Sequence, residues 1–454
     1  MSKQDFITAA ANHLAEIEEA RKGKQIVVSD FVSKDADGNT YQYVDVVMEG
    51  GGVLGLALVG YLYALERAGI RFLSIGGTSA GSIVALLTAA AGKPHEARIE
   101  KLIEVMAKMP VASFQDGDDD AREFIDWLKD ETDKLFQPGI SFSEIGAWVS
   151  GISKILQVRD NFKKDLGLCK GEAFKNWVSK QLTQFGISST RSLMEKIQPG
   201  PGEISYVGNE PDPAARLARL KASLCLVASD LTTERKVCFP NDTALYFDDP
   251  YNVSPAEYVR ASMSVPFFFH PKRCSVPSSQ ETSVRWGQVV TDGESRAQKY
   301  GANWPPKECV LVDGGIMSNF PIDAFHAKTR VPSCPTFGVK LEVDRPYTEI
   351  DSPVDLLFQL FNGARHCRDN DFIEQNPDFN KLVQSIDTGN HNWLNFNISQ
   401  KDQIDLFKRG VEAAKQFLLG DGSGRSAFDW ANYKEIRRGI AEAENASATG
   451  VANA

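Results

Sequence analysis

Ser79 and Asp313 both stand at glycine-flanked turns that follow short apolar runs, and both side chains can take part in ester chemistry. Ser79 lies between Gly77 and Gly81 in the string Gly-Thr-Ser-Ala-Gly, after the apolar run 72–75 and before an apolar helical stretch. This spacing allows a sharp strand-to-helix turn that exposes the hydroxyl. Because N–H groups at a helix start favour developing negative charge, the pattern favours a nucleophilic Ser79 over a helix-capping serine.

Asp313 is the candidate base for this serine. The six histidines do not follow strand-end turns with small neighbours; they are His13, His95, His270, His326, His366 and His391. Asp313 ends the apolar run 309–312 and precedes Gly314 and Gly315. We therefore expect its carboxylate at the same carboxyl edge of a sheet as Ser79. An unperturbed aspartate has a pKa of about 3.9, so this role requires burial that raises its basicity.

A glycine-rich loop, Glu49 to Gly55, lies between a predicted strand and a predicted helix. Consecutive glycines turn tightly and direct backbone N–H groups outward, which makes an anion site. We expect Gly50, Gly51, Gly52 and Val53 to surround an oxyanion. The string also fits the G-x-G-x-x-G dinucleotide fingerprint, but the next strand, 72–75, ends in glycine where a ribose-binding acid is required. Nucleotide binding therefore stays as a minor alternative.

Short strands alternate with helices around these motifs, which predicts a parallel α/β sheet. The runs 44–48 and 72–75 are predicted strands, each followed by a helix, and the sheet resumes at 224–228, 309–312 and 336–343. A mostly helical cap insertion is expected over about 93–200. We expect three parts: an N-terminal helical extension and linker (1–40), a catalytic domain (41–420) and a C-terminal tail (421–454), disordered from Asn445 onward.

Taken in this order, the three motifs resemble the patatin-like phospholipases. That family carries a glycine-rich oxyanion loop, a G-x-S-x-G serine and a D-G-G or D-G-A aspartate, and it uses a Ser/Asp dyad without histidine. The likeness spans about 43–420, with similar stretches at 227–233, 261–266 with Phe269, 313–321 and 386–389, and with Gly167, Gly171, Trp177, Ala413, Ala414 and Phe417. It implies a three-layer α/β fold: a central, mainly parallel sheet flanked by helices, with a helical cap insertion.

One position departs from that family's pattern. Many members carry Lys or Arg just before the last glycine of the loop, where this chain has Leu54. The resemblance then implies that this protein depends more on backbone N–H groups to hold an oxyanion.

Composition and charge restrict the partners. The chain has 454 residues with 60 acidic against 50 basic residues and a net charge of -10, so nucleic acid is not an expected partner. Its seven cysteines are scattered without a C-x-x-C pair, which indicates reduced thiols. The N-terminus lacks the layout of a signal peptide, and the longest apolar run, 53–65, is too short to cross a bilayer. We therefore expect a cytoplasmic protein, with at most peripheral membrane contact.

Two charged segments of the cap have different interpretations. Residues 151–180 hold seven basic against three acidic residues among apolar neighbours, so they could meet anionic lipid headgroups, although a solvated helix face explains them as well. The acidic run 116–120 lacks the glycine position and the closing glutamate of a calcium loop, and we interpret it as a solvated loop that caps the next helix. We expect no metal and no other cofactor.

The sequence thus predicts a lipid acyl hydrolase of the phospholipase A or lysophospholipase type, acting through Ser79, Asp313 and an acyl-enzyme. Two alternatives stay open: a Ser/His/Asp carboxylesterase of the α/β-hydrolase type, which would need an essential histidine, and a non-catalytic nucleotide-binding module.

Overall fold

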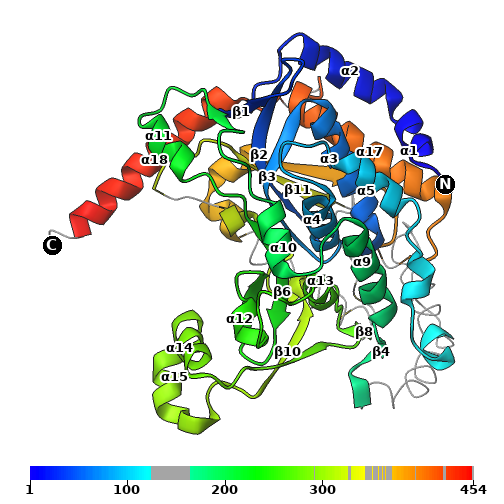
Figure 1. Cartoon of the computed structure of the whole chain (residues 1–454). Coiled ribbons are helices and arrows are strands. Elements are labelled where there is room, and N and C mark those ends of the chain that lie inside the picture. Colours follow the sequence, from blue (N-terminus) through cyan, green and yellow to red (C-terminus); the bar gives the residue numbers. More distant parts are fainter. Residues whose placement is uncertain are drawn as a thin grey trace.

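The computed structural model describes residues 1–123, 164–290, 292–325, 329–342, 371–393, 395–422 and 426–451, together with residues 350, 356, 360 and 363. A central sheet organises them (Figure 1). Five of its strands run parallel to one another in the order β12 (Val383–Asp387), β11 (Thr336–Glu342), β2 (Thr40–Met48), β3 (Ile70–Thr78) and β6 (Leu224–Asp230). Every residue of β3 is buried, as expected for a strand covered on both faces.

Antiparallel strands extend this parallel centre. β10 (Glu308–Asp313) pairs with β6, and β9 (Lys272–Ser275) pairs with β10. β7 (Arg235–Phe239) also pairs with β6, while β1 (Phe31–Lys34) pairs with β2 and with β5 (Ser205–Tyr206). The sheet is therefore mixed, with a parallel centre. A separate two-stranded sheet joins β4 (Gly167–Cys169) to β8 (Phe267–Phe269).

Helices flank the sheet. In Figure 1, α3 (Gly55–Arg67), α4 (Ala80–Ala91), α5 (Ile99–Met106) and α17 (Gln400–Leu419) lie to one side of β2 and β3. Helices α11 (Pro213–Ala218) and α18 (Trp430–Val451) lie to the other side. This arrangement is the predicted α/β fold of a mainly parallel sheet between helices.

Helices α3 and α17 approach each other closely enough for their backbones to touch. A Cβ placed on Gly60 would lie 2.0 Å from the carbonyl oxygen of Phe407, and one on Gly410 would lie 1.9 Å from that of Ala57. Larger side chains at either glycine would push the helices apart. The last helix of the predicted catalytic domain is thus packed directly against the helix that follows the glycine-rich loop.

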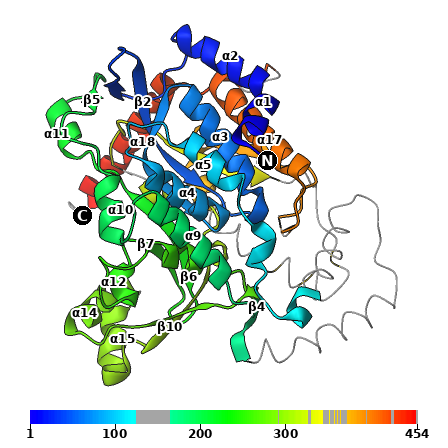
Figure 2. The same cartoon turned by 45° about the vertical axis from the view of Figure 1, so that its right-hand side comes forward.

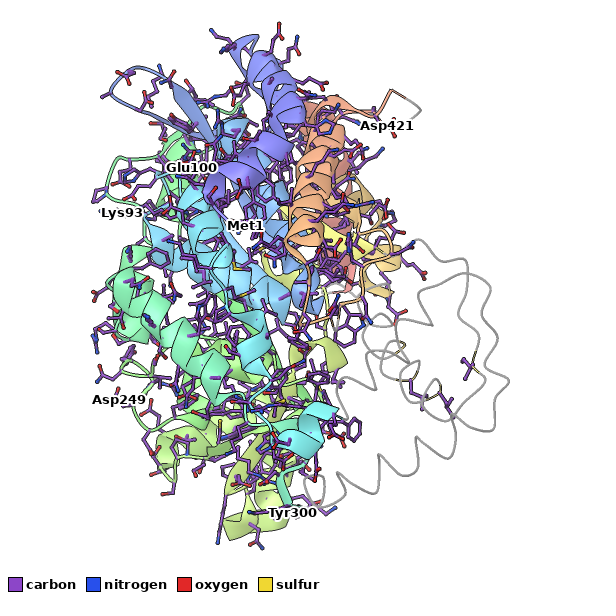
Figure 3. All side chains as sticks on the ribbon, turned by 90° about the vertical axis from the view of Figure 1, so that its right-hand side faces the viewer. Met1, Lys93, Glu100, Asp249, Tyr300 and Asp421 are labelled. Atoms are coloured by element: carbon purple, nitrogen blue, oxygen red, sulfur yellow. A yellow bond between two sulfur atoms is a disulfide. The ribbon has the colours of Figure 1, made fainter. Side chains whose placement is uncertain are left out.

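The two ends of the chain are helical. The predicted N-terminal helical extension contains two helices, α1 (Lys3–Ala9) and α2 (Ala11–Lys22), and both contact α17. Lys3 binds the carboxylate of Glu100 on α5 at 3.2 Å; Met1 and Glu100 are labelled in Figure 3. At the other end α18 continues to Val451, and residues 452–454 lie outside the described residues. The disorder expected from Asn445 onward stays a prediction.

The polar segment 277–308 forms two further helices, α14 (Gln280–Val289) and α15 (Gly293–Tyr300). Tyr300 lies at the opposite end of the molecule from the N-terminal helices (Figure 3). Within the predicted cap, the structure describes α5, α9 (Glu172–Gln184), α10 (Thr190–Lys196) and the strand β4 (Figure 2). Residues 124–163, which hold the first half of the predicted lipid-facing surface, lie outside the described residues.

The prediction that all cysteines are reduced thiols is wrong for two of them. Cys225 and Cys238 form a disulfide, with their Cα atoms 5.3 Å apart. They come close because β6 and β7 are antiparallel neighbours in which Cys238 pairs with Val227, two residues after Cys225. The sequence pattern did not indicate this pairing. Cys169, Cys274, Cys309 and Cys334 are free and buried, and Cys367 lies outside the described residues. No helix among the described residues is long and apolar enough to cross a membrane.

Candidate active site

Ser79 occupies a sharp turn between β3 and α4. Its backbone has φ 51° and ψ -119°, a conformation that residues other than glycine rarely adopt. The two flanking glycines make the turn possible: a Cβ on Gly77 would lie 2.4 Å from the carbonyl carbon of Gly81, and one on Gly81 would lie 2.5 Å from the carbonyl oxygen of Met48. The structure therefore has the elbow that the G-x-S-x-G spacing predicts, with Ser79 at its apex.

The backbone of Ser79 is held by two other serines. Its N–H donates to Oγ of Ser262 at 2.9 Å, and that hydroxyl donates to the carbonyl of Val227 at 2.5 Å. Ser262 ends α13 (Ala256–Ser262), and Val227 lies in β6. On the other side, Ser82 donates its hydroxyl to the carbonyl of Ser79 at 2.6 Å. These bonds fix the strained peptide units on both sides of the candidate nucleophile.

Asp313 lies beside this turn, but it arrives from the opposite direction to the one predicted. β10 is antiparallel to β6, so its last residue is not at the carboxyl edge of a parallel strand. Asp313 nevertheless reaches the level of Ser79, because it pairs with Ala228 while Thr78 pairs with Val227. Only about 1% of Asp313 is exposed, and its Oδ1 accepts the N–H of Gly315 at 2.7 Å.

The glycine-rich loop lies against Ser79. A Cβ on Gly50 would lie 3.1 Å from Cβ of Ser79. Two of the four predicted oxyanion donors bind elsewhere: the N–H of Gly50 donates to the carbonyl of Asn319 at 3.0 Å, and that of Val53 donates to the carbonyl of Trp393 at 3.1 Å. Among the described residues, the N–H groups of Gly51 and Gly52 have no such acceptor.

Gly52 cannot be replaced without moving its neighbour. It has φ +54°, and a Cβ on it would lie 2.2 Å from the carbonyl oxygen of Trp393. Leu54, which replaces the basic residue of many family members, is only 3% exposed and packs in the hydrophobic core. A cation at position 54 would therefore be buried here, which explains why an apolar residue suits this chain.

Glu49 and Asn319 hold the glycine-rich loop in place through buried hydrogen bonds. The side-chain N–H of Asn319 donates to Oε1 of Glu49 at 3.0 Å, and the other carboxylate oxygen of Glu49 accepts the N–H of Leu341 at 2.7 Å. Both side chains are buried. Leu341 belongs to β11, so the loop is attached both to the neighbouring strand and to the segment that follows Asp313.

Ser79 lines a cavity of about 70 Å³ whose walls are apolar. Among the described residues that line this cavity, Ser79 is the one with a hydroxyl group, and none is charged. Gly52 and Ala80 also line it, and its aromatic walls are Phe114, Phe174, Phe268, Phe269, Trp393 and Phe396. The rings of Phe268 and Phe396 stack with centroids 5.3 Å apart. This environment suits a hydrocarbon chain with a reactive group at the serine.

Two of the described histidines bind carboxylates away from Ser79. No described histidine lines the cavity. His391 binds Oδ2 of Asp405 at 3.0 Å, and His95 binds Oε2 of Glu203 at 3.1 Å. Burial lowers the pKa of His270 below its usual value, and its carbonyl accepts a bond from Arg260. His326 and His366 lie outside the described residues.

Several positioning groups could not be found from residue types alone. Ser262, Ser264 and Asn319 lie in the stretches that resemble the family, but their bonds to the motif residues depend on the fold. Trp393 carried no sequence signal. The acidic run contains caps, as predicted: Asp118 accepts the N–H of Ala121, while Asp116 accepts that of Gly171 at 2.8 Å beside the start of α9.

The chain is similar to the uncharacterized protein YqhO of Bacillus subtilis (strain 168), with 27% identity over 379 residues that cover 83% of this chain and 98% of the relative. Among solved structures, VipD of Legionella pneumophila matches with 15% identity and a TM-score of 0.38, covering 86% of this chain and 70% of VipD.

A second solved structure, the ExoU–SpcU complex of the Pseudomonas aeruginosa type III secretion system, matches with 14% identity and a TM-score of 0.32, covering 85% of this chain and 52% of the matched chain. The sequence model of the patatin-like phospholipases matches residues 46–326, which include the glycine-rich loop, Ser79 and Asp313. Since that match extends over more than half of the chain, the protein belongs to the patatin-like phospholipase family.

Proposed function

We propose that the protein is a lipid acyl hydrolase in which Ser79 is the nucleophile and Asp313 the base. The observation that carries this proposal is the placement of Ser79. This strained, glycine-flanked serine lines an apolar cavity, and among the described residues of the lining it is the one with a hydroxyl group. A cavity of this kind accepts the hydrocarbon part of an ester while its carbonyl meets the serine.

The proposed reaction has two steps. Asp313 accepts the proton of the Ser79 hydroxyl while Oγ attacks the carbonyl carbon of the ester. The tetrahedral intermediate collapses, the lysolipid or alcohol leaves with the proton from Asp313, and the acyl group stays on Ser79. Water then gives a proton to Asp313 and attacks the acyl-enzyme, and the fatty acid leaves as Ser79 regains a proton.

Backbone N–H groups would hold the oxyanion of both intermediates. Of the four donors expected from the sequence, we propose Gly51 and Gly52, because the N–H groups of Gly50 and Val53 already donate to carbonyls of the protein. Preorganised donors of this kind act strongly in a site that excludes water. The apolar cavity supports phospholipids or other fatty-acyl esters as substrates, reached through peripheral contact with a lipid surface.

The test compares product release from mixed phospholipid vesicles by the wild type, Ser79→Ala and Asp313→Asn. Mass spectrometry of free fatty acid and lysolipid identifies the headgroup and the acyl position together. We expect product from the wild type and at least a 1000-fold loss in each variant. His391→Ala is the control for a histidine-dependent esterase and should keep its activity. Full activity of Ser79→Ala would refute the proposed dyad. So would a result in which His391→Ala is the one variant of the three that loses activity.

A further inference from the structure

The backbone N–H of Ser79 is bound to a side chain that is remote in sequence. The Oγ of Ser262 accepts a hydrogen bond from this N–H at 2.9 Å, and the hydroxyl donates a hydrogen bond to the carbonyl of Val227 at 2.5 Å. The hydroxyl thus bridges the elbow to β6, and Ser262 is 0% exposed, so water does not replace either bond.

The same short segment also holds Asp313. The N–H of Asp313 donates to the carbonyl of Ser264 at 2.8 Å, two residues after Ser262. Arg260, which is also buried, donates to Oγ of Ser264 at 2.5 Å and to the carbonyl of His270 at 2.9 Å. The segment 260–264 therefore touches the backbone of both dyad residues and is itself anchored by a guanidinium group.

We propose that Ser262 is a positioning residue that sets the location of the Ser79 hydroxyl relative to Asp313. The inference rests on the proposed function, and it concerns a residue that does not line the cavity or touch the reacting atoms. Ser79 is held at φ 51°, a conformation that persists only where surrounding contacts impose it. The bond to Ser262 is the contact that fixes the peptide N–H of this strained residue.

The chemistry of the bridge requires a hydroxyl group. The same side-chain group must accept a hydrogen bond from the N–H of Ser79 and donate one to the carbonyl of Val227. A serine hydroxyl does both, and the methyl group of alanine does neither. Without the bridge the elbow relaxes toward a less strained turn and the Ser79 oxygen moves. Displacements of about 1 Å at a reacting centre cost on the order of 100-fold in rate.

The experiment uses Ser262→Ala and Ser262→Cys in the full chain. A cysteine keeps the volume of the side chain but is a weak donor and acceptor, so it preserves packing if the alanine variant does not fold. Two rates are measured: kcat and KM for a chromogenic fatty-acyl ester, and the rate at which a fluorophosphonate probe modifies Ser79, followed by mass spectrometry. In that modification the Ser79 oxygen binds phosphorus, fluoride leaves and the proton goes to the base.

Ser29→Ala is the matched control. Ser29 is also buried, accepts a backbone N–H, that of Phe31 at 3.1 Å, and donates to a backbone carbonyl, that of Ser333 at 3.4 Å. It does not line the cavity. Removing this bridge changes the stability of the fold without touching the elbow, so it reports what a merely structural hydroxyl contributes.

We expect Ser262→Ala and Ser262→Cys to lower kcat and the probe rate by about 10- to 100-fold, with KM within about threefold of the wild type. Ser29→Ala should keep both rates. If Ser79→Ala is inactive, two results overturn the positioning role. One is a folded Ser262 variant with the kcat of the wild type; the other is a loss of kcat and probe rate in Ser29→Ala as large as that in the Ser262 variants. Full activity of Ser79→Ala would instead refute the proposed function, so the two failures are distinguishable.

Discussion

The side-chain amide of Asn319 donates to the carboxylate of Glu49 at 3.0 Å, across 270 residues of sequence. It also donates to the carbonyl of Gly50 at 3.3 Å, while the backbone carbonyl of Asn319 accepts the N–H of Gly50 at 3.0 Å. The segment after Asp313 and the start of the glycine-rich loop are thereby joined by three bonds. Two parts of the candidate site that are far apart in sequence are held in one arrangement.

Asn319→Ala should therefore weaken both stability and activity. The buried Glu49 carboxylate would lose a donor, which costs about 2 kcal/mol of unfolding free energy, and the loop would lose its register against Ser79. Denaturant unfolding and vesicle hydrolysis measure the two effects. An Asn319→Ala variant with the stability and rate of the wild type would show that this link does not hold the loop.

Gly81→Ala should disrupt the elbow. The added methyl group would lie 2.5 Å from the carbonyl oxygen of Met48 and 2.8 Å from that of Glu49, so β2 and the start of α4 must separate. We expect a loss of about 1–3 kcal/mol in unfolding free energy and of at least 100-fold in activity.

Gly287→Ala is the control for the elbow variant. Gly287 lies within α14, and its added Cβ would meet a single atom at 3.9 Å. Alanine is the better helix former there, so this variant should be equal to the wild type or up to about 1 kcal/mol more stable. If both glycine variants behave alike, the crowding at Gly81 is not what maintains the turn.

The buried carboxyl group of Asp45 should make the unfolding free energy of the protein fall as the pH rises. Burial raises the pKa of its carboxyl from 3.8 to about 6, although Ser74 donates to it at 2.9 Å. The native state then binds more protons than the unfolded chain between these two values. This contribution is present in full below pH 3.8 and is lost as the pH rises through about 6.

The fall should amount to about 3 kcal/mol, since one pKa unit corresponds to 1.36 kcal/mol. Asp45→Asn removes the titrating group, so its unfolding free energy should change less between pH 4 and pH 7 than that of the wild type. Asp37→Asn, at an exposed position, should follow the wild type. Parallel pH profiles for the wild type and Asp45→Asn would contradict the assignment.

The disulfide between Cys225 and Cys238 should be detectable by differential alkylation under denaturing conditions. Both cysteines should be unmodified until a reductant is added. Because the bond closes a loop with a sequence separation of 13 residues, replacing both cysteines by alanine should cost about 3 kcal/mol on the loop-entropy estimate. Alkylation of both residues without reductant would show that the bond is not formed.

The motifs and the central strands could be predicted because each depends on local sequence. The glycines around Ser79 specify the elbow wherever the strand and helix lie, and the apolar runs of β2, β3 and β6 are strands that need burial on both faces. The order and direction of strands depend on contacts between distant segments. The antiparallel direction of β10, which ends at Asp313, and the pairing of β6 with β7 therefore could not be inferred from the residues of these strands.

Hydrogen-bond partners were hidden for the same reason. Ser262 is an ordinary serine at the end of a short helix, and its importance lies in two bonds made across 183 and 35 residues. The donors of the glycine-rich loop were predicted as a group of four, because the acceptors that occupy two of them, at Asn319 and Trp393, come from remote segments.

The packing of α17 on α3 shows that the part of the chain that packs together extends beyond the segment matched by the family model. The family match ends at residue 326, yet β11 pairs with β2, α17 covers α3, and Leu341 and Trp393 contact the glycine-rich loop. A protein cut at the family boundary would expose the edge of β2 and the apolar face of α3 to water and to other chains. The stretch that holds the candidate site is thus shorter than the stretch that must fold together, so we expect substitutions after residue 326 to lower activity when they disturb these contacts.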